Sequence, residues 1–163
     1  MSEFRNIRVL FLDLDGVVNI PDGGNVFGRS LFETKRMQMI KQIIAETNAK
    51  LILSSNWRLA PKSFATAKYV FEDVMGVPIY GVTPFVQPTG DTMNHQADAR
   101  SKEILGWLKS QKESNNFIEG WIAIDDLELD LLDPYFIKTD YNVGITSELT
   151  NKAITLLKTN NAH

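Results

Sequence analysis

A short apolar run near the start of the chain ends in two aspartates and a glycine. Residues 9–12 read Val-Leu-Phe-Leu, and residues 13–16 read Asp-Leu-Asp-Gly. A continuous apolar run is typical of a strand buried on both faces of a parallel sheet. In an extended chain Asp13 and Asp15 would share a face, and Gly16 permits a turn directly after them. The pattern predicts either two carboxylates at the ligand-binding edge of an α/β sheet or a polar strand end with an Asp-Gly turn.

The composition indicates a soluble globular domain and excludes thiol chemistry. The 163 residues, 44% of them hydrophobic, suit a single domain spanning residues 1–163. A net charge of −3 argues against a broadly basic nucleic-acid-binding surface, although it leaves room for a local basic site. The chain has no cysteine, which excludes disulfides, zinc–thiolate sites and thiol nucleophiles.

The composition and the first residues also bear on location. Residues 1–8 contain Glu3, Arg5, Asn6 and Arg8, unlike a secretory signal, and no segment approaches the ~20 apolar residues of a membrane span. We therefore expect a cytoplasmic protein without membrane contact. The sequence gives no sign of an obligate protein partner.

Strand-like and helix-like segments alternate along the chain. We expect strands over residues 7–12, 50–53, 121–124 and 135–138, and helices over residues 30–47, 61–75, 100–112 and 147–157. Ser30, with Glu33 three residues later, predicts a capping box for the first helix, and Ser147 is expected to cap the last. Residues 19–29 and 77–94 are rich in glycine and proline, which indicates a loop at 19–29 and, at 77–94, a broken segment with short extended pieces over residues 79–86. This order predicts an α/β fold, a three-layer α/β/α sandwich around a mostly parallel sheet.

Polar residues follow three of these strands directly. They are Asp13 and Asp15, then Ser54 and Ser55, then Asp125 and Asp126. The carboxyl ends of parallel strands lie along one edge of a sheet. The sequence therefore predicts that carboxylates and hydroxyls meet in one site.

In this order the chain resembles the haloacid dehalogenase (HAD) superfamily of phosphotransferases, over about residues 7 to 126. A narrower resemblance is to the small HAD phosphatase domains of RNA-repair proteins and to the 3′-phosphatase domain of phage polynucleotide kinase. It rests on Asp-Leu-Asp-Gly at 13–16, Ser-Ser-Asn-Trp-Arg at 54–58, Arg-Ser-Lys-Glu-Ile at 100–104 and Ile-Asp-Asp at 124–126.

The resemblance implies a Mg²⁺ phosphatase that works through an aspartyl-phosphate. Asp13 would be the nucleophile, a role that suits a carboxylate because it is ionised at neutral pH. The alternative for Asp13 is metal ligation alone. Asp15 would be the general acid and base, with its backbone carbonyl on the metal. Asp125 and Asp126 would complete the Mg²⁺ site.

The same resemblance implies a set of groups that bind the substrate phosphate. Ser54 matches the family's phosphate-binding hydroxyl, with Ser55 as the alternative, and Asn56 could reach the same phosphate. Either serine could instead be an N-cap or a turn residue.

A basic residue near position 100 is also implied. Arg100 lies four residues before Ile104, so it shares the inward face of the predicted helix, whereas Lys102 would point away from that face. We favour Arg100 and keep Lys102 as the alternative; either could be a solvated surface cation.

Trp57 and Arg58 allow two interpretations. They could stack on a base and grip a second phosphate, or Trp57 could pack in the core while Arg58 forms a surface ion pair. His95, in a predicted loop, could line the site or be exposed. Trp107 and Trp121 fit core positions.

The short connections predict a small cap or none, and an open site favours a phosphate on a macromolecule. The expected substrate is therefore a phosphorylated molecule, with a nucleic-acid or nucleotide phosphate end favoured. The alternatives are a small-metabolite phosphatase, a phosphoprotein phosphatase and a non-catalytic binding module on the HAD scaffold.

Overall fold

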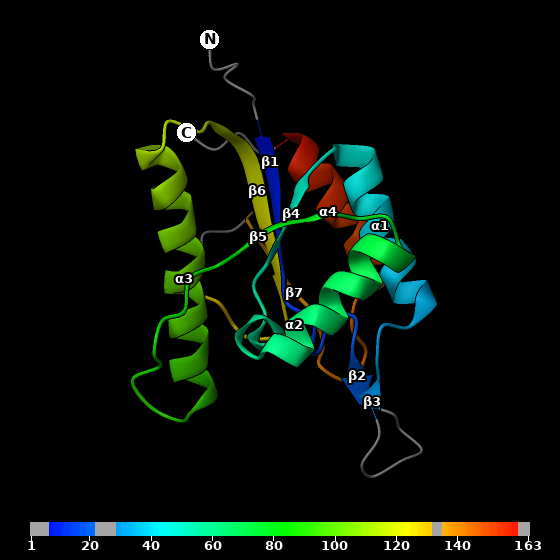
Figure 1. Cartoon of the computed structure of the whole chain (residues 1–163), viewed down its shortest axis with the longest axis horizontal. Coiled ribbons are helices and arrows are strands. Elements are labelled where there is room, and N and C mark those ends of the chain that lie inside the picture. Colours follow the sequence, from blue (N-terminus) through cyan, green and yellow to red (C-terminus); the bar gives the residue numbers. More distant parts are fainter. Residues whose placement is uncertain (1–6, 22–28, 132–134, 160–163) are drawn as a thin grey trace.

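A five-stranded parallel sheet forms the centre of the molecule (Figure 1). The computed structural model describes residues 7–21, 29–131 and 135–159. The strands run in the spatial order β5-β4-β1-β6-β7 and are all parallel. Their bounds are β1 (Ile7–Leu12), β4 (Lys50–Leu53), β5 (Ile79–Val82), β6 (Ile118–Asp125) and β7 (Phe136–Lys138). The first strand of the chain is thus the central strand of the sheet.

Helices cover both faces of this sheet, so the predicted three-layer sandwich is confirmed. Figure 1 shows α3 (Met93–Glu113) alone on one face. The other face carries α1 (Thr34–Thr47), α2 (Pro61–Lys68) and α4 (Ser147–Thr159). None of the helices in the described residues is long and apolar enough to cross a membrane.

The central strand is buried on both faces, as its apolar run predicts. Val9 and Phe11 pack in the cluster under α3, whereas Leu10 and Leu12 pack in the cluster under the other three helices. All four side chains are fully buried. Trp107 and Trp121 each pack edge-on against the Phe11 ring, as expected for core residues.

The predicted starts of the first and third helices and the predicted caps of the first and last were wrong, whereas the last helix begins at Ser147 as predicted. Ser30 belongs to a strand and caps nothing; α1 follows Glu33, whose side chain makes no capping hydrogen bond. The last helix is capped by Thr146 instead of Ser147, because the Thr146 hydroxyl accepts the Leu149 N–H at 3.2 Å. The third begins at Met93, seven residues earlier than position 100.

Regular structure occurs in both glycine- and proline-rich segments, with β5 within the extended pieces expected at residues 79–86, and short helical elements occur elsewhere. A hairpin of β2 (Ile20–Pro21) and β3 (Arg29–Ser30) replaces the plain loop after β1. A 3₁₀ turn, η1 (Asn56–Leu59), follows β4, and η2 (Tyr69–Val74) continues α2 as a π-helix. In the described residues, this hairpin is the one regular element inserted between β1 and α1.

Candidate active site

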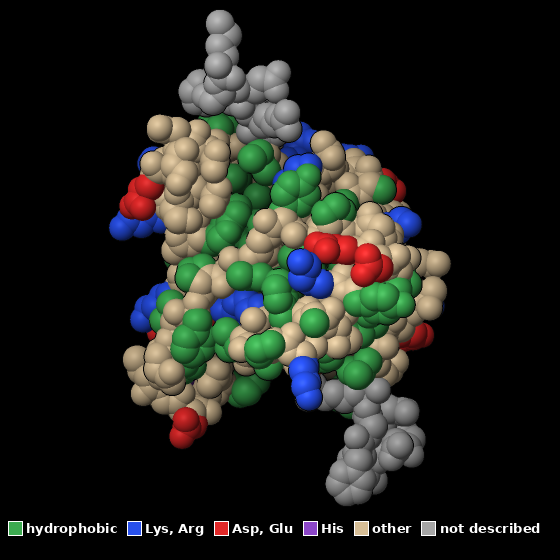
Figure 2. Space-filling view, in the orientation of Figure 1, with side chains coloured by type: hydrophobic (Ala, Val, Ile, Leu, Met, Phe, Trp, Pro, Cys, Tyr) green, Lys and Arg blue, Asp and Glu red, His purple; other side chains and the backbone are tan. Residues whose placement is uncertain are grey.

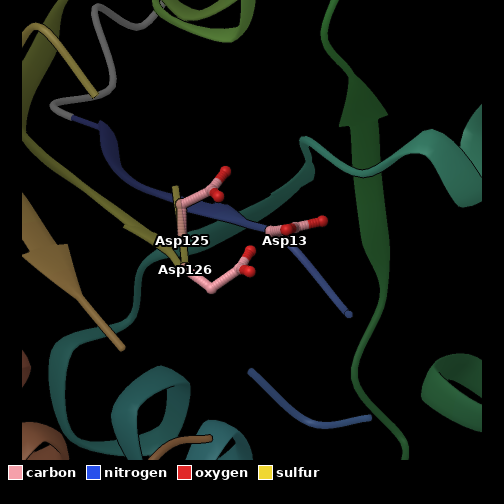
Figure 3. A group of neighbouring side chains, drawn as sticks. All are labelled: Asp13, Asp125 and Asp126. Carbon is pink, nitrogen blue, oxygen red and sulfur yellow. The ribbon is translucent and has the colours of Figure 1, made fainter. Parts of the chain in front are cut away.

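Three carboxylates meet at the carboxyl ends of β1 and β6. Ligand oxygens of Asp13, Asp125 and Asp126 all lie within 4.8 Å of one another. Figure 3 shows Asp13 after β1, and Asp125 and Asp126 at the end of β6, with the Asp126 carboxylate directed toward Asp13. Asp13 and Asp125 are buried and Asp126 is half-buried.

Strand alternation explains why this cluster forms under α3. Phe11 and Ala123 pack on the α3 side of the sheet, so Asp13 and Asp125, two residues later on each strand, follow on that side. The register pairs Leu12 with Ile124, which brings the two carboxylates level.

Gly16 allows Asp126 to complete the cluster. A Cβ at position 16 would lie 2.6 Å from the Cβ and Cγ of Asp126, and Gly16 has a φ of +79°. A side chain at this position would be strained and would displace the Asp126 carboxylate.

Burial and the neighbouring charge of Asp13 raise the pKa values of Asp125 and Asp126. Burial, together with the charge of Asp13, raises the pKa of Asp126 to about 6. The same two causes raise the pKa of Asp125 well above its ordinary value, and the positive charge of Arg100 only partly offsets them. A cluster whose anionic form is this unfavourable is suited to binding a cation.

Arg100 supplies the positive charge beside the cluster. Its Nη1 donates to Asp125 Oδ2 at 2.7 Å and lies 3.4 Å from Asp13 Oδ1. Burial alone would lower the pKa of Arg100, but the charges of Asp13, Asp125 and Glu103 raise it above its ordinary value.

Lys102, the alternative basic residue, lies outside the cluster. Its Nζ pairs with Asp98 Oδ2 at 2.8 Å, and its side chain is 57% exposed. Of the two cations, the structure therefore brings only Arg100 to the carboxylates.

The polar residues after β4 differ in their access to the pocket. Ser55 and Asn56 line the pocket, and the Ser55 hydroxyl accepts the Trp57 N–H at 3.3 Å as the cap of η1. Ser54 is 1% exposed, and its hydroxyl has no hydrogen-bond partner in the described residues. Asn56 Oδ1 lies 3.4 Å from Arg100 Nη2. The choice between Ser54 and Ser55 as the phosphate-binding hydroxyl stays open.

Asp15 lies in the turn after β1 and contacts Trp57. The Trp57 indole Nε1 donates to Asp15 Oδ1 at 3.2 Å. The Trp57 ring also packs edge-on against Phe32, with centroids 5.2 Å apart. Trp57 thus packs against the core, and the sequence did not reveal its bond to Asp15.

The expected surface ion pair of Arg58 was wrong, because the pair is buried. Arg58 Nη2 lies 2.8 Å from Glu103 Oε2, and the two side chains are 2% and 5% exposed. Arg58 also donates to the backbone carbonyls of Ser55, Thr83 and Pro84. Burial lowers the pKa of Arg58, and Glu103 opposes that shift.

The cluster opens into a pocket of about 210 Å³. Of the residues singled out in the sequence, Asp13, Asp15, Ser55, Asn56, Arg100 and Asp126 line it. Met93, Gln96 and Leu127 also line it and were missed. Met93 and Gln96 precede Arg100 by seven and four residues, so the helical spacing would have indicated them had the start of α3 been known.

His95 lies in the first turn of α3 and not in a loop. Its backbone N–H donates to the Thr92 hydroxyl at 3.3 Å, and its Nδ1 lies 2.8 Å from the same hydroxyl. His95 is not among the residues that line the pocket. It therefore helps to start the helix that carries Arg100.

Comparison with known proteins agrees with this geometry. Residues 9–149 match the model of the family described as "HAD domain in Swiss Army Knife RNA repair proteins". No curated protein matches the chain. The resemblance to the HAD domains of RNA-repair proteins is therefore confirmed, and the chain belongs to this family.

Proposed function

We propose that this chain is a Mg²⁺-dependent phosphomonoester hydrolase that forms an aspartyl-phosphate on Asp13. Membership of the HAD family supports a phosphatase-type hydrolase. The observation that carries the finer proposal is the position of Asp13. Its carboxylate lines an open pocket beside the Arg100 guanidinium and the carboxylates of Asp125 and Asp126.

The residues of the cluster fit a hard divalent cation. Three carboxylates converge within 4.8 Å, and the pKa values of Asp125 and Asp126 are raised because both groups are buried and lie beside the charge of Asp13. Mg²⁺ prefers oxygen ligands, so the carboxylates of Asp13, Asp125 and Asp126 and the Asp15 carbonyl would hold it. When bound, the cation neutralises charge on the phosphoryl oxygens and on the nucleophile.

Asp13 and Asp15 divide the first step between them. An Asp13 oxygen attacks phosphorus and forms a P–O bond while the bond from phosphorus to the leaving oxygen breaks. Asp15 donates its proton to that oxygen, so an alcohol departs and Asp15 becomes a carboxylate. Arg100 lies beside Asp13 and stabilises the charge that develops on the phosphoryl group.

The second step restores both residues. The Asp15 carboxylate takes a proton from water as the water oxygen attacks phosphorus. The bond between phosphorus and Asp13 breaks, which releases inorganic phosphate and the Asp13 carboxylate. Hydroxyl and amide groups after β4 are near enough to the pocket to orient the phosphoryl oxygens.

A nucleic-acid or nucleotide phosphate end is the substrate we favour. The family is named for RNA-repair proteins, and the pocket is open to solvent. On the face shown in Figure 2, the described Lys and Arg side chains occur singly or in small groups. Recognition would therefore rest on the terminal phosphate and its nearest neighbours, and not on a long basic track.

A panel of phosphorylated substrates, assayed with Mg²⁺, tests both the enzyme assignment and the substrate assignment. It would compare 3′- and 5′-phosphorylated oligonucleotides with mononucleotides, sugar phosphates and phosphopeptides. We expect phosphate release that EDTA abolishes, and the highest kcat/KM on an oligonucleotide or nucleotide end. A preference for sugar phosphates would overturn the substrate assignment, and no release from any member would overturn the enzyme assignment.

Arg100→Ala and Lys102→Ala form a matched pair on one helix. We expect Arg100→Ala to lower kcat/KM by about 10²- to 10³-fold, because the charge beside Asp13 is lost. Lys102→Ala should change kcat/KM by less than about twofold, because its exposed pair with Asp98 contributes little. Steady-state kinetics on one substrate compares them, and equal losses in both variants would contradict the assignment.

Mg²⁺ should stabilise the fold more strongly at pH 7.5 than at pH 5. The pKa of Asp126 is about 6 in the folded protein, above its ordinary value of 3.8. Between these values the folded state holds the extra proton, so this group's contribution to stability falls as pH rises toward 6. The cation needs the deprotonated form and offsets that loss above pH 6.

Thermal unfolding with Mg²⁺ and with EDTA measures this effect. We expect the Mg²⁺-induced rise in Tm to be small at pH 5, large at pH 7.5 and lost in Asp126→Asn. Glu128→Gln is the control, because Glu128 lies two residues away and its side chain is 74% exposed. Equal rises at both pH values would contradict the prediction.

A further inference from the structure

Trp57 contacts the carboxylate to which we assign the general acid. Its indole Nε1 lies 3.2 Å from Asp15 Oδ1. Asn19 Nδ2 approaches the same oxygen at 3.4 Å, near the outer limit for a hydrogen bond. Both donors meet Oδ1, and the indole makes the shorter contact.

The Trp57 side chain is anchored at its ring and at its backbone. The ring packs edge-on against Phe32 at 81°, and Phe32 packs edge-on against the buried Phe71. The backbone N–H of Trp57 donates to the Ser55 hydroxyl in the cap of η1. Rotating the ring outward to stack on a base would break the contacts with Phe32 and Asp15.

The contacts of Trp57 and Asp15 belong to a closed network that also includes Asn19 and Phe32. Asn19 is 1% exposed, and its Oδ1 accepts the Phe32 N–H at 2.8 Å. Phe32 has a φ of 49°, a conformation that residues other than glycine rarely adopt. Hydrogen bonds thus join Trp57 to Asp15, Asp15 to Asn19 and Asn19 to Phe32, and the ring contact returns to Trp57.

We propose that Trp57 is a positioning residue that holds Asp15 for proton transfer; this inference rests on the proposed function. Because Oδ1 accepts the indole N–H, the transferable proton is carried on Oδ2. In the first step that proton moves to the ester oxygen as its bond to phosphorus breaks and the bond from Asp13 forms. The products are an alcohol, the aspartyl-phosphate and an Asp15 carboxylate that still accepts the indole N–H.

The substitution Trp57→Phe tests the role, since it removes the donor and keeps an aromatic ring against Phe32. The readout is kcat/KM for two phosphate esters, one with an aliphatic alcohol and one with dinitrophenolate as the leaving group. We expect a loss of about 10²-fold on the aliphatic ester, because its leaving oxygen needs the proton. The dinitrophenyl ester should change by less than about threefold, since its leaving group departs without a proton.

Two further variants serve as controls for the comparison of the two esters. Asp15→Asn removes the general acid and should show the same dependence on the leaving group more strongly. Trp107→Phe changes a tryptophan on the α3 side of the sheet and should leave both esters unaffected. An equal loss on both esters in Trp57→Phe, or no loss on the aliphatic ester, would overturn the inference while the proposed function stands. Failure of the unsubstituted protein to hydrolyse either ester would overturn both.

An NMR measurement tests the hydrogen bond between Trp57 and Asp15 without relying on enzyme activity, which a misfolded variant would also lose. The chain has three tryptophans and so three indole N–H signals in a ¹H–¹⁵N spectrum. Asp15→Ala should shift the Trp57 signal and leave those of Trp107 and Trp121 in place. An unshifted Trp57 signal would show that the hydrogen bond is not formed, and would overturn the inference.

Discussion

Asp13→Asn is expected to abolish phosphate release while the protein stays folded. An amide is a far poorer nucleophile than a carboxylate, so we expect a fall in kcat of about 10⁴-fold. We expect little net change in stability, because the charge of Asp13 disfavours the Asp125 and Asp126 carboxylates but favours the Arg100 guanidinium. Arg100 keeps its contacts with Asp125 and Glu103 in this variant.

Phosphate release and thermal unfolding should be measured on the same preparation. Glu128→Gln removes one carboxylate from the exposed segment after β6 and should leave both quantities unchanged. Full activity in Asp13→Asn would refute the aspartyl-phosphate mechanism. A lost activity together with an unfolded protein would refute the expectation that these two effects of the Asp13 charge offset each other.

The strands and the acidic cluster could be predicted because they depend on local sequence. The apolar runs at 7–12 and 50–53 became β1 and β4 with the predicted bounds. Parallel strands align their carboxyl ends, so the positions of Asp13 and Asp125 followed from the fold class alone. Arg100 could be chosen over Lys102 because helical spacing separates their faces.

The start of α3 could not be predicted, because its first two turns bury only two small apolar residues, Ala97 and Ala99. Met93 is 64% exposed, and Gln96 lies against the pocket instead of the core. Two alanines among polar residues give too weak an apolar pattern to indicate a helix from periodicity. Thr92 as a helix cap was the remaining clue.

Contacts between polar residues that lie far apart in the sequence could not be predicted either. Trp57 and Asp15 are 42 residues apart, and a motif shows only that Trp57 follows a strand. The ion pair of Arg58 could not be predicted for the same reason, because its partner Glu103 lies on α3. Residue type restricted these side chains to a few roles, and only tertiary packing selected among them.

The buried pair of Arg58 and Glu103 is expected to have the largest effect on stability. Glu103 Oε1 accepts the Val86 N–H at 2.9 Å, while Oε2 lies 2.8 Å from Arg58 and 3.5 Å from Arg100. One carboxylate therefore joins α3 to the segments after β4 and β5. Glu103→Gln removes its charge and leaves two neighbouring guanidinium groups, Arg58 and Arg100, with less compensation.

Removing one partner of a buried ion pair costs about 3–5 kcal/mol. For a chain of this length that corresponds to a fall in Tm of about 10 °C. Urea unfolding of Glu103→Gln measures the cost directly. Asp98→Asn is the matched control on the same helix, because it breaks the exposed pair with Lys102 and should cost less than about 0.5 kcal/mol.

A double variant distinguishes the stabilisation by the Arg58–Glu103 pair from the cost of leaving the buried Arg58 charge without its partner. Arg58→Met with Glu103→Met removes both charges and keeps apolar bulk, so it should recover part of the loss seen in Glu103→Gln. Recovery should be incomplete, because Arg58 also donates to the carbonyls of Ser55, Thr83 and Pro84. An unfolding midpoint for Glu103→Gln equal to that of Asp98→Asn would show that the pair does not hold these segments together.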